Sequence, residues 1–129
     1  WKSQTEVFQL LLQSDITIIP HLKSEHSDNT SPNKIFHYML AKKPIIASNC
    51  NYIKNIIEKE KCGLIYENKS PVDFTEKLSL MLNDIDKWPK WGENGKKAVH
   101  EKHNWNSTSQ PLIALYNNFE NDNRRLQQI

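Results

Sequence analysis

The chain has 129 residues, which is enough for one domain with a single hydrophobic core. Its 17 lysine and arginine residues nearly balance 15 aspartate and glutamate residues, and almost all the positive charge is lysine, so no dedicated nucleic-acid surface is expected. No run approaches the ~20 apolar residues that a transmembrane helix requires, which excludes an obvious membrane span.

Helical and strand-like patterns alternate along the first half of the chain. Apolar residues spaced as on one helix face predict a helix at 5–13. A short β-branched run that ends at a proline predicts a buried strand at 15–20. The polar stretch at 21–30 has no periodicity and is expected to be a loop. A second helix is predicted at 32–42, followed by a second buried strand at 44–48.

The second half continues the alternation. The elements predicted there are, in order, a helix at 51–61, a strand at 62–66, a helix at 71–83, a connector broken by proline at 84–90, a charged helix at 93–102, a turn at 104–106 and an apolar helix at 109–119. The polar tail after Glu120 is expected to fray, as chain ends without an apolar face usually do.

Three short strands alternating with helices predict an α/β fold with a parallel sheet, flanking helices and a C-terminal helical segment. A complete Rossmann-like sheet usually has about six strands, so three strands indicate a partial one. The chain also opens on Trp1 and enters a helix almost at once. We therefore expect a fragment whose upstream strands are missing.

Several common kinds of reactive site do not occur in this sequence. Its 3 glycines exclude a Gly-x-Gly phosphate loop, and there is neither a Walker loop nor a Ser-His-Asp order. His100 and His103 lack the spacing of a zinc-binding pair, so no metal site is expected. Cys50 and Cys62 predict buried reduced thiols rather than a disulfide framework.

The start of the second predicted helix carries the strongest chemical signal. Ser31 is a good N-cap, and Pro32 suits the first helical position because its missing N–H is not needed there. The free N–H groups of this helix start, with Lys34 one turn further on, suit an anion such as a phosphate. Many helices begin with Ser-Pro and bind nothing, so these residues alone leave both interpretations open.

The motifs in and after this helix start follow a fixed order. They are Ser-Pro-Asn-Lys-Ile-Phe at 31–36, Tyr-Met at 38–39, Lys-Pro-Ile-Ile-Ala-Ser at 43–48, Tyr-Ile-Lys-Asn-Ile-Ile at 52–57, Cys-Gly-Leu-Ile-Tyr at 62–66 and His-Asn-Trp at 103–105. This order resembles the C-terminal, nucleotide-sugar-binding half of retaining GT-B glycosyltransferases, the glycosyl transferases of group 1. The resemblance implies that residues 1–129 form part of this Rossmann-like donor domain, with its last helix and polar tail at 104–129.

The resemblance also implies where a sugar donor binds. The backbone amides around Thr30, Ser31 and Asn33 match those that hold the donor diphosphate, and the ammonium group of Lys34 adds positive charge. The alternative for Lys34 is a solvated side chain that only faces water.

Two positions depart from the family's Glu-x7-Glu motif, whose acids align with Asn29 and His37. In the family the first acid usually contacts the sugar and the second holds the ribose hydroxyls. Both residues present here can still form hydrogen bonds, and we expect the His37 ring to point toward the same cleft as the Ser31 amides. The alternative for His37 is a partly buried histidine without a ligand.

The implied reaction is transfer of a hexose from a nucleoside-diphosphate sugar to a glycan, lipid or other acceptor, without a metal or cofactor. The acceptor domain and a cationic diphosphate pair lie upstream in such enzymes, so this chain alone is expected to be inactive. The resemblance implies polysaccharide biosynthesis in the cytoplasm, or at the inner face of the membrane for the full-length enzyme. Abundant Lys, Asn and Ile are associated with AT-rich bacterial genomes.

Two alternatives to a glycosyltransferase remain open from the sequence. A non-catalytic α/β binding or regulatory domain, such as a response-regulator-like module, would need an acidic phosphorylation site at the end of a strand. Asp15 stands at the wrong end of its predicted strand for that role. A sugar-nucleotide epimerase of GT-B architecture would need a His or Glu acid–base pair facing the cleft.

Overall fold

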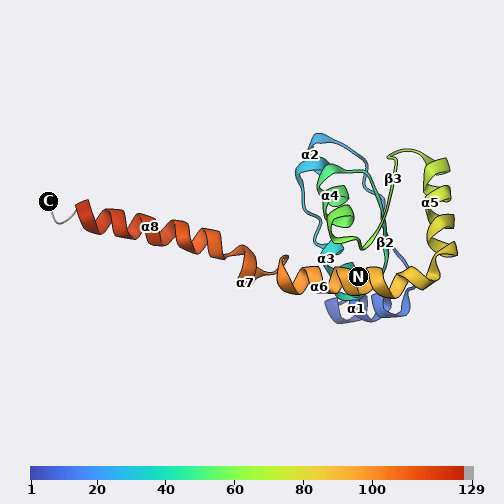
Figure 1. Ribbon diagram of the computed structural model, residues 1–129, viewed down its shortest axis with the longest axis horizontal. Coiled ribbons are helices and arrows are strands. Elements are labelled where there is room, and N and C mark those ends of the chain that lie inside the picture. Colours follow the sequence, from blue (N-terminus) through green and yellow to red (C-terminus); the bar gives the residue numbers. More distant parts are fainter. Residues whose placement is uncertain (127–129) are drawn as a thin grey trace. The chain divides into compact units, whose positions relative to one another are not determined.

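The computed structural model describes the backbone of residues 1–126 and the side chains of residues 1–119. Two compact units divide the chain after Val99. The first unit contains three strands, β1 (Thr17–Ile19), β2 (Ile45–Ser48) and β3 (Gly63–Tyr66). All three are parallel, in the order β1-β2-β3, which confirms the predicted α/β sheet (Figure 1).

Helices cover both faces of this sheet. The helices of the first unit are α1 (Gln4–Gln13), α2 (Glu25–Asn29), α3 (Lys34–Leu40), α4 (Asn51–Glu60), α5 (Pro71–Asn83), the 3-10 turn η1 (Ile85–Lys87) and most of α6 (Trp88–Glu101), although α1 buries none of its residues. Figure 1 shows α4 and α5 on opposite sides of the strands. β2 is the central strand, and among the described residues β1 and β3 each pair on one side only.

The larger of two apolar clusters fills the face covered by α3 and α4. It joins Ile19, Ile45 and Ala47 of the strands to Ile35 and Met39 of α3, all of which are fully buried. The apolar faces of α3 and α4 predicted from the sequence therefore pack on the sheet, and this packing stabilises both helices more than their intrinsic propensity does.

A smaller cluster lies on the opposite face, beneath α5. Ile46 of β2 and Met81 of α5 are its fully buried members, and Trp88 and Trp91 pack against it. The indole Nε1 of Trp88 donates a 2.9 Å hydrogen bond to the carbonyl of Met81, so its one polar atom is satisfied. This bond and the apolar contact fix the turn between α5 and α6.

Two predictions for the first unit were wrong. Within the stretch expected to be a loop at 21–30, α2 forms because Ser24 and Ser27 make a reciprocal capping box at its start. The charged helix expected at 93–102 begins earlier, at Trp88, and includes Pro89. Proline is tolerated in the first turn of a helix, where its missing N–H leaves no bond unmade.

The second unit contains α7 (Trp105–Thr108) and α8 (Gln110–Leu126). The turn predicted at 104–106 is thus the start of α7, because the Asn104 side chain accepts a 2.9 Å hydrogen bond from the amide of Ser107 and caps a helix there. The helix predicted at 109–119 continues to Leu126. The tail predicted to fray belongs partly to α8, and its last residues, 127–129, lie outside the described part of the chain.

Both cysteines are free and fully buried, as predicted. Burial, reinforced by the nearby Glu60 carboxylate, raises the pKa of the Cys62 thiol to about 12. The thiol therefore stays protonated at neutral pH and is no nucleophile. None of the helices in the described part of the chain is long and apolar enough to cross a lipid bilayer.

Candidate functional site

The residues predicted to bind a donor lie between β1 and α3, and we call residues 29–34 the donor segment. The helix after it begins at Lys34 with Asn33 as its N-cap, so the predicted cap at Ser31 is wrong by two positions. Asn33 already has helical backbone angles, φ −55° and ψ −27°, and it gives no side-chain cap. The turn from Pro32 to Ile35, closed by a 3.1 Å hydrogen bond, precedes the helix instead.

This turn decides which amides an anion could reach. The N–H groups of Ile35 and Phe36 donate to the carbonyls of Pro32 and Asn33 at 3.1 and 3.2 Å. The N–H groups of residues 31, 33 and 34 come before them, and no side-chain cap covers this helix start. The shift of the first helical residue thus leaves the prediction of an anion site at residues 31–34 untested.

The side chains of Asn29 and Thr30 have a different role from the one predicted for their segment. The Asn29 side-chain amide donates to the carbonyl of Glu25 at 2.9 Å, and the Thr30 hydroxyl donates to that of His26 at 2.6 Å. Both bonds satisfy carbonyls at the C-terminal end of α2. The side-chain oxygen and second N–H of Asn29, the lone pairs of the Thr30 hydroxyl and the backbone of both residues are left for a ligand.

Lys34 and His37 are both exposed and lie one turn apart on the same face of α3. Together they line a depression of about 350 Å³, with Tyr38 and residues from α1 and β1. His37 also borders a second depression, of about 460 Å³, along α1. The structure thus brings these two predicted residues together, beside the edge of β1 that pairs with no other strand among the described residues.

His21 lies two residues after β1 and is not among the residues predicted to bind a donor. Its carbonyl accepts hydrogen bonds from the Ser48 hydroxyl at 2.6 Å and from the side-chain amide of Asn68 at 2.8 Å. Burial, and then the positive charge of nearby Lys34, lower the pKa of His21. Its ring is therefore neutral at pH 7. The one sequence signal for this residue is its position close after a predicted strand.

A polar network joins the carboxyl ends of all three strands. The side-chain amide of Asn49 donates to Glu67 at 2.7 Å, and its side-chain oxygen accepts from the amide of Asn68 at 3.0 Å. Asn68 in turn binds the His21 carbonyl. Ligands of open α/β sheets bind at this edge, and the network ties the three strand ends together there.

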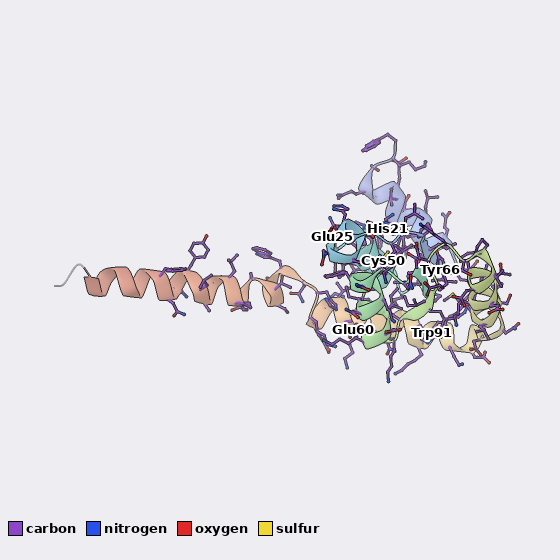
Figure 2. The ribbon with its side chains drawn as sticks, turned by 90° about the horizontal axis from the view of Figure 1, so that it is seen from above. His21, Glu25, Cys50, Glu60, Tyr66 and Trp91 are labelled. Atoms are coloured by element: carbon purple, nitrogen blue, oxygen red, sulfur yellow. The ribbon has the colours of Figure 1, made fainter. Side chains whose placement is uncertain are left out.

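The Cys50 thiol lies 3.6 Å from the carbonyl of His21. Figure 2 labels His21, Cys50 and Tyr66. Burial raises the pKa of Tyr66. The Tyr66 and Phe74 rings meet edge to face at 5.1 Å. Together with His21 they line an apolar depression of about 400 Å³. The described residues contain no cluster of three or more His, Cys, Asp or Glu side chains placed to hold a metal ion.

The chain is similar to known proteins in both sequence and fold. The sequence profile described as "Glycosyl transferases group 1" matches residues 1–84. Sucrose-phosphate synthase from Thermosynechococcus elongatus has a similar structure, with a TM-score of 0.73 at 17% identity, over 88% of this chain and 27% of that one. WaaG, a glycosyltransferase involved in lipopolysaccharide biosynthesis, also has a similar structure. Its TM-score is 0.66 at 16% identity, over 88% of this chain and 29% of WaaG.

These two likenesses concern the fold alone, because their sequence identities are low. The chain spans less than a third of the length of either structure. No curated protein matches the chain significantly.

Proposed function

The chain belongs to the glycosyl transferases group 1 family, and on that premise we propose that it forms part of the donor site of a hexosyltransferase. The observation that carries this proposal is the family match over residues 1–84, since that range includes β1, the donor segment and α3. The substrate is a nucleoside-diphosphate sugar, and the acceptor is a glycan, a lipid or another hydroxyl compound that the rest of the enzyme binds.

In this proposal the donor segment holds the diphosphate. The amides of Ser31 and Asn33 donate to phosphate oxygens, and the ammonium group of Lys34 contributes charge. Negative charge builds up on the leaving diphosphate as the glycosidic bond breaks, and fixed N–H groups and a cation stabilise it without a metal or cofactor. Asn29 contacts the sugar through its side-chain oxygen.

We propose that His37 binds the donor ribose. It shares one exposed face of α3 with Lys34, so a ligand whose phosphates meet Lys34 would place its ribose one helical turn further along. An imidazole can accept a hydrogen bond from a ribose hydroxyl, although it is a weaker acceptor than a carboxylate.

The activity and its setting are proposed for the full-length enzyme. This chain alone is expected to be inactive, because it spans only part of the similar structures. We place the enzyme in the cytoplasm, or at the inner face of the membrane when the acceptor is a lipid. The test is an assay of the full-length protein with a panel of nucleoside-diphosphate sugars. Absence of both donor turnover and donor binding across the panel would contradict the proposal.

Substitution of Lys34 tests the diphosphate site. Lys34→Ala is expected to weaken binding of a nucleoside diphosphate several-fold, in line with roughly 1 kcal/mol for a partly exposed charge contact. Lys59→Ala is the matched control, because Lys59 is an exposed lysine in the last turn of α4. Calorimetric titration measures both affinities, and equal weakening by the two variants would show that only net charge matters.

Substitution of His37 tests the ribose contact in the full-length enzyme. His37→Glu is expected to keep or strengthen donor binding, because a carboxylate is a better acceptor for ribose hydroxyls. His37→Leu is expected to weaken it by about 1 kcal/mol, the net value of a typical hydrogen bond. If the leucine variant binds the donor as well as the wild type does, residue 37 has no role in binding.

A further inference from the structure

We propose that Asp28 is a positioning residue for donor binding. Its carboxylate holds the short helix α2 against the start of α4, and this contact fixes the donor segment that follows. The inference rests on the proposed function of that segment, and it assigns a role to a residue outside it.

The start of α4 has no cap of its own. Its N-cap residue, Cys50, makes no side-chain capping bond, and its first turn contains no acidic residue. Instead, the Asp28 carboxylate accepts a 2.8 Å hydrogen bond from the amide of Asn51, the first residue of α4. A carboxylate at a helix N-terminus satisfies a free N–H group and interacts favourably with the helix dipole. Asp28, 23 positions earlier in the chain, therefore caps the start of α4 in place of a neighbouring residue.

Further contacts hold α2 at the same place. The buried Ser27 hydroxyl donates to the carbonyl of Leu22 at 2.8 Å. The Cys50 thiol lies 3.6 Å from the oxygen of this hydroxyl. The Lys23 ammonium group donates to the side-chain oxygen of Asn51 at 3.4 Å. Contacts with the start of α4 thus come from residues just before Asp28 as well, and the Asp28 carboxylate makes the shortest of these hydrogen bonds.

The donor segment begins where this anchored helix ends. The side chains of Asn29 and Thr30 bond back to carbonyls of α2, so both residues move with that helix. At the other end of the segment, Ile35 is fully buried in the core. The donor segment therefore connects two anchored parts of the chain, α2 and Ile35. Loss of the Asp28 contact frees the α2 end of the segment. A preorganised segment binds its ligand more tightly because less ordering is needed on binding.

Asn51 offers a test that leaves the charge of Asp28 in place. Proline is favoured at the first position of a helix, and Cys50 before it already has extended angles, φ −61° and ψ 132°, that suit a residue preceding proline. Asn51→Pro thus removes the N–H that Asp28 binds with little strain. Asn51→Ala is the matched control, since it keeps this N–H and loses only the side chain.

Asp28 itself gives a second pair of variants. Both Asp28→Ala and Asp28→Asn remove a negative charge close to the proposed anion site, so electrostatics alone predicts tighter anion binding in both. Only the asparagine variant keeps an acceptor oxygen for the Asn51 amide. Positioning therefore predicts weaker binding for alanine than for asparagine.

The experiment measures, by calorimetric titration, how tightly the wild type, these four variants and Ser70→Ala bind inorganic diphosphate. Asn51→Pro and Asp28→Ala are each expected to bind about fivefold more weakly than their controls, as expected when one hydrogen bond that orders a binding loop is lost. Ser70→Ala, which removes the hydroxyl cap of α5, is expected to lower stability without changing affinity.

Two failures remain distinguishable. If the wild type does not bind diphosphate at millimolar concentration, the proposed donor site fails, and the positioning role fails with it. If the wild type binds but each variant binds as tightly as its control, only the role of Asp28 is overturned. Should Asp28→Ala not fold, the comparison between Asn51→Pro and Asn51→Ala decides.

Discussion

Replacement of Gly63 by alanine is expected to prevent stable pairing of β2 with β3. Gly63 is the first residue of β3 and lies in register with Ile45 of β2. A Cβ atom at this position would overlap the carbonyl oxygen of Ile45 and lie 2.7 Å from its carbonyl carbon. Both obstacles are backbone atoms in the central strand, so they cannot move aside without breaking the sheet. We expect the free energy of unfolding to fall by more than about 4 kcal/mol, a loss that few single substitutions cause.

Gly95→Ala is the matched control for this prediction. A Cβ atom on Gly95 would lie 3.3 Å from atoms of Met39, a tight contact that a small shift can relieve. The gain in helix propensity, roughly 1 kcal/mol, opposes the crowding, so the net change should stay within about 1 kcal/mol. Urea denaturation followed by circular dichroism measures both variants. A Gly63→Ala protein that unfolds at the wild-type urea concentration would contradict the observed strand register.

Replacement of Ile46 by alanine is expected to have the next largest effect. Ile46 lies in the central strand and is fully buried in the cluster beneath α5. Truncation of a fully buried isoleucine removes apolar contacts and leaves a cavity, which costs about 2–5 kcal/mol.

Ile18→Ala provides the comparison for Ile46→Ala. Ile18 is the register partner of Ile46 on β1, but its side chain is 42% exposed. Its truncation should cost about 1 kcal/mol or less, because little apolar surface is returned to water. The two variants are compared by the same denaturation experiment. Equal decreases in the free energy of unfolding would show that β1 is covered as fully as β2, contrary to the structure.

The strands could be predicted because their signal is local. Each is a short apolar run between polar residues or prolines, and all three lie within one residue or two of the predicted bounds. The helix α2 could not be predicted in this way, since a helix of five residues has no apolar period and is held by capping bonds and contacts with α4. The start of α6 was missed because Pro89 resembles a helix breaker and is in fact a first-turn residue.

The candidate site could also be predicted only where its signal is local. Lys34 and His37 could be singled out from a motif, because neighbours along one helix face are fixed by helix geometry. The bonds from Ser48 and Asn68 to His21, and from Asn51 to Asp28, join residues 23 to 47 positions apart. Such contacts depend on how the strands and helices pack, and no spacing in a single sequence reveals them.

Binding of a nucleotide-sugar diphosphate by the donor segment is tested most directly by titrating the isotope-labelled chain with a nucleoside diphosphate and recording amide NMR shifts. Progressive shifts are expected for the amides of residues 30–35, apart from Pro32, with smaller changes in α5 on the other face of the sheet. If the amides of residues 30–35 do not move at millimolar nucleoside diphosphate, the donor segment is not a diphosphate site.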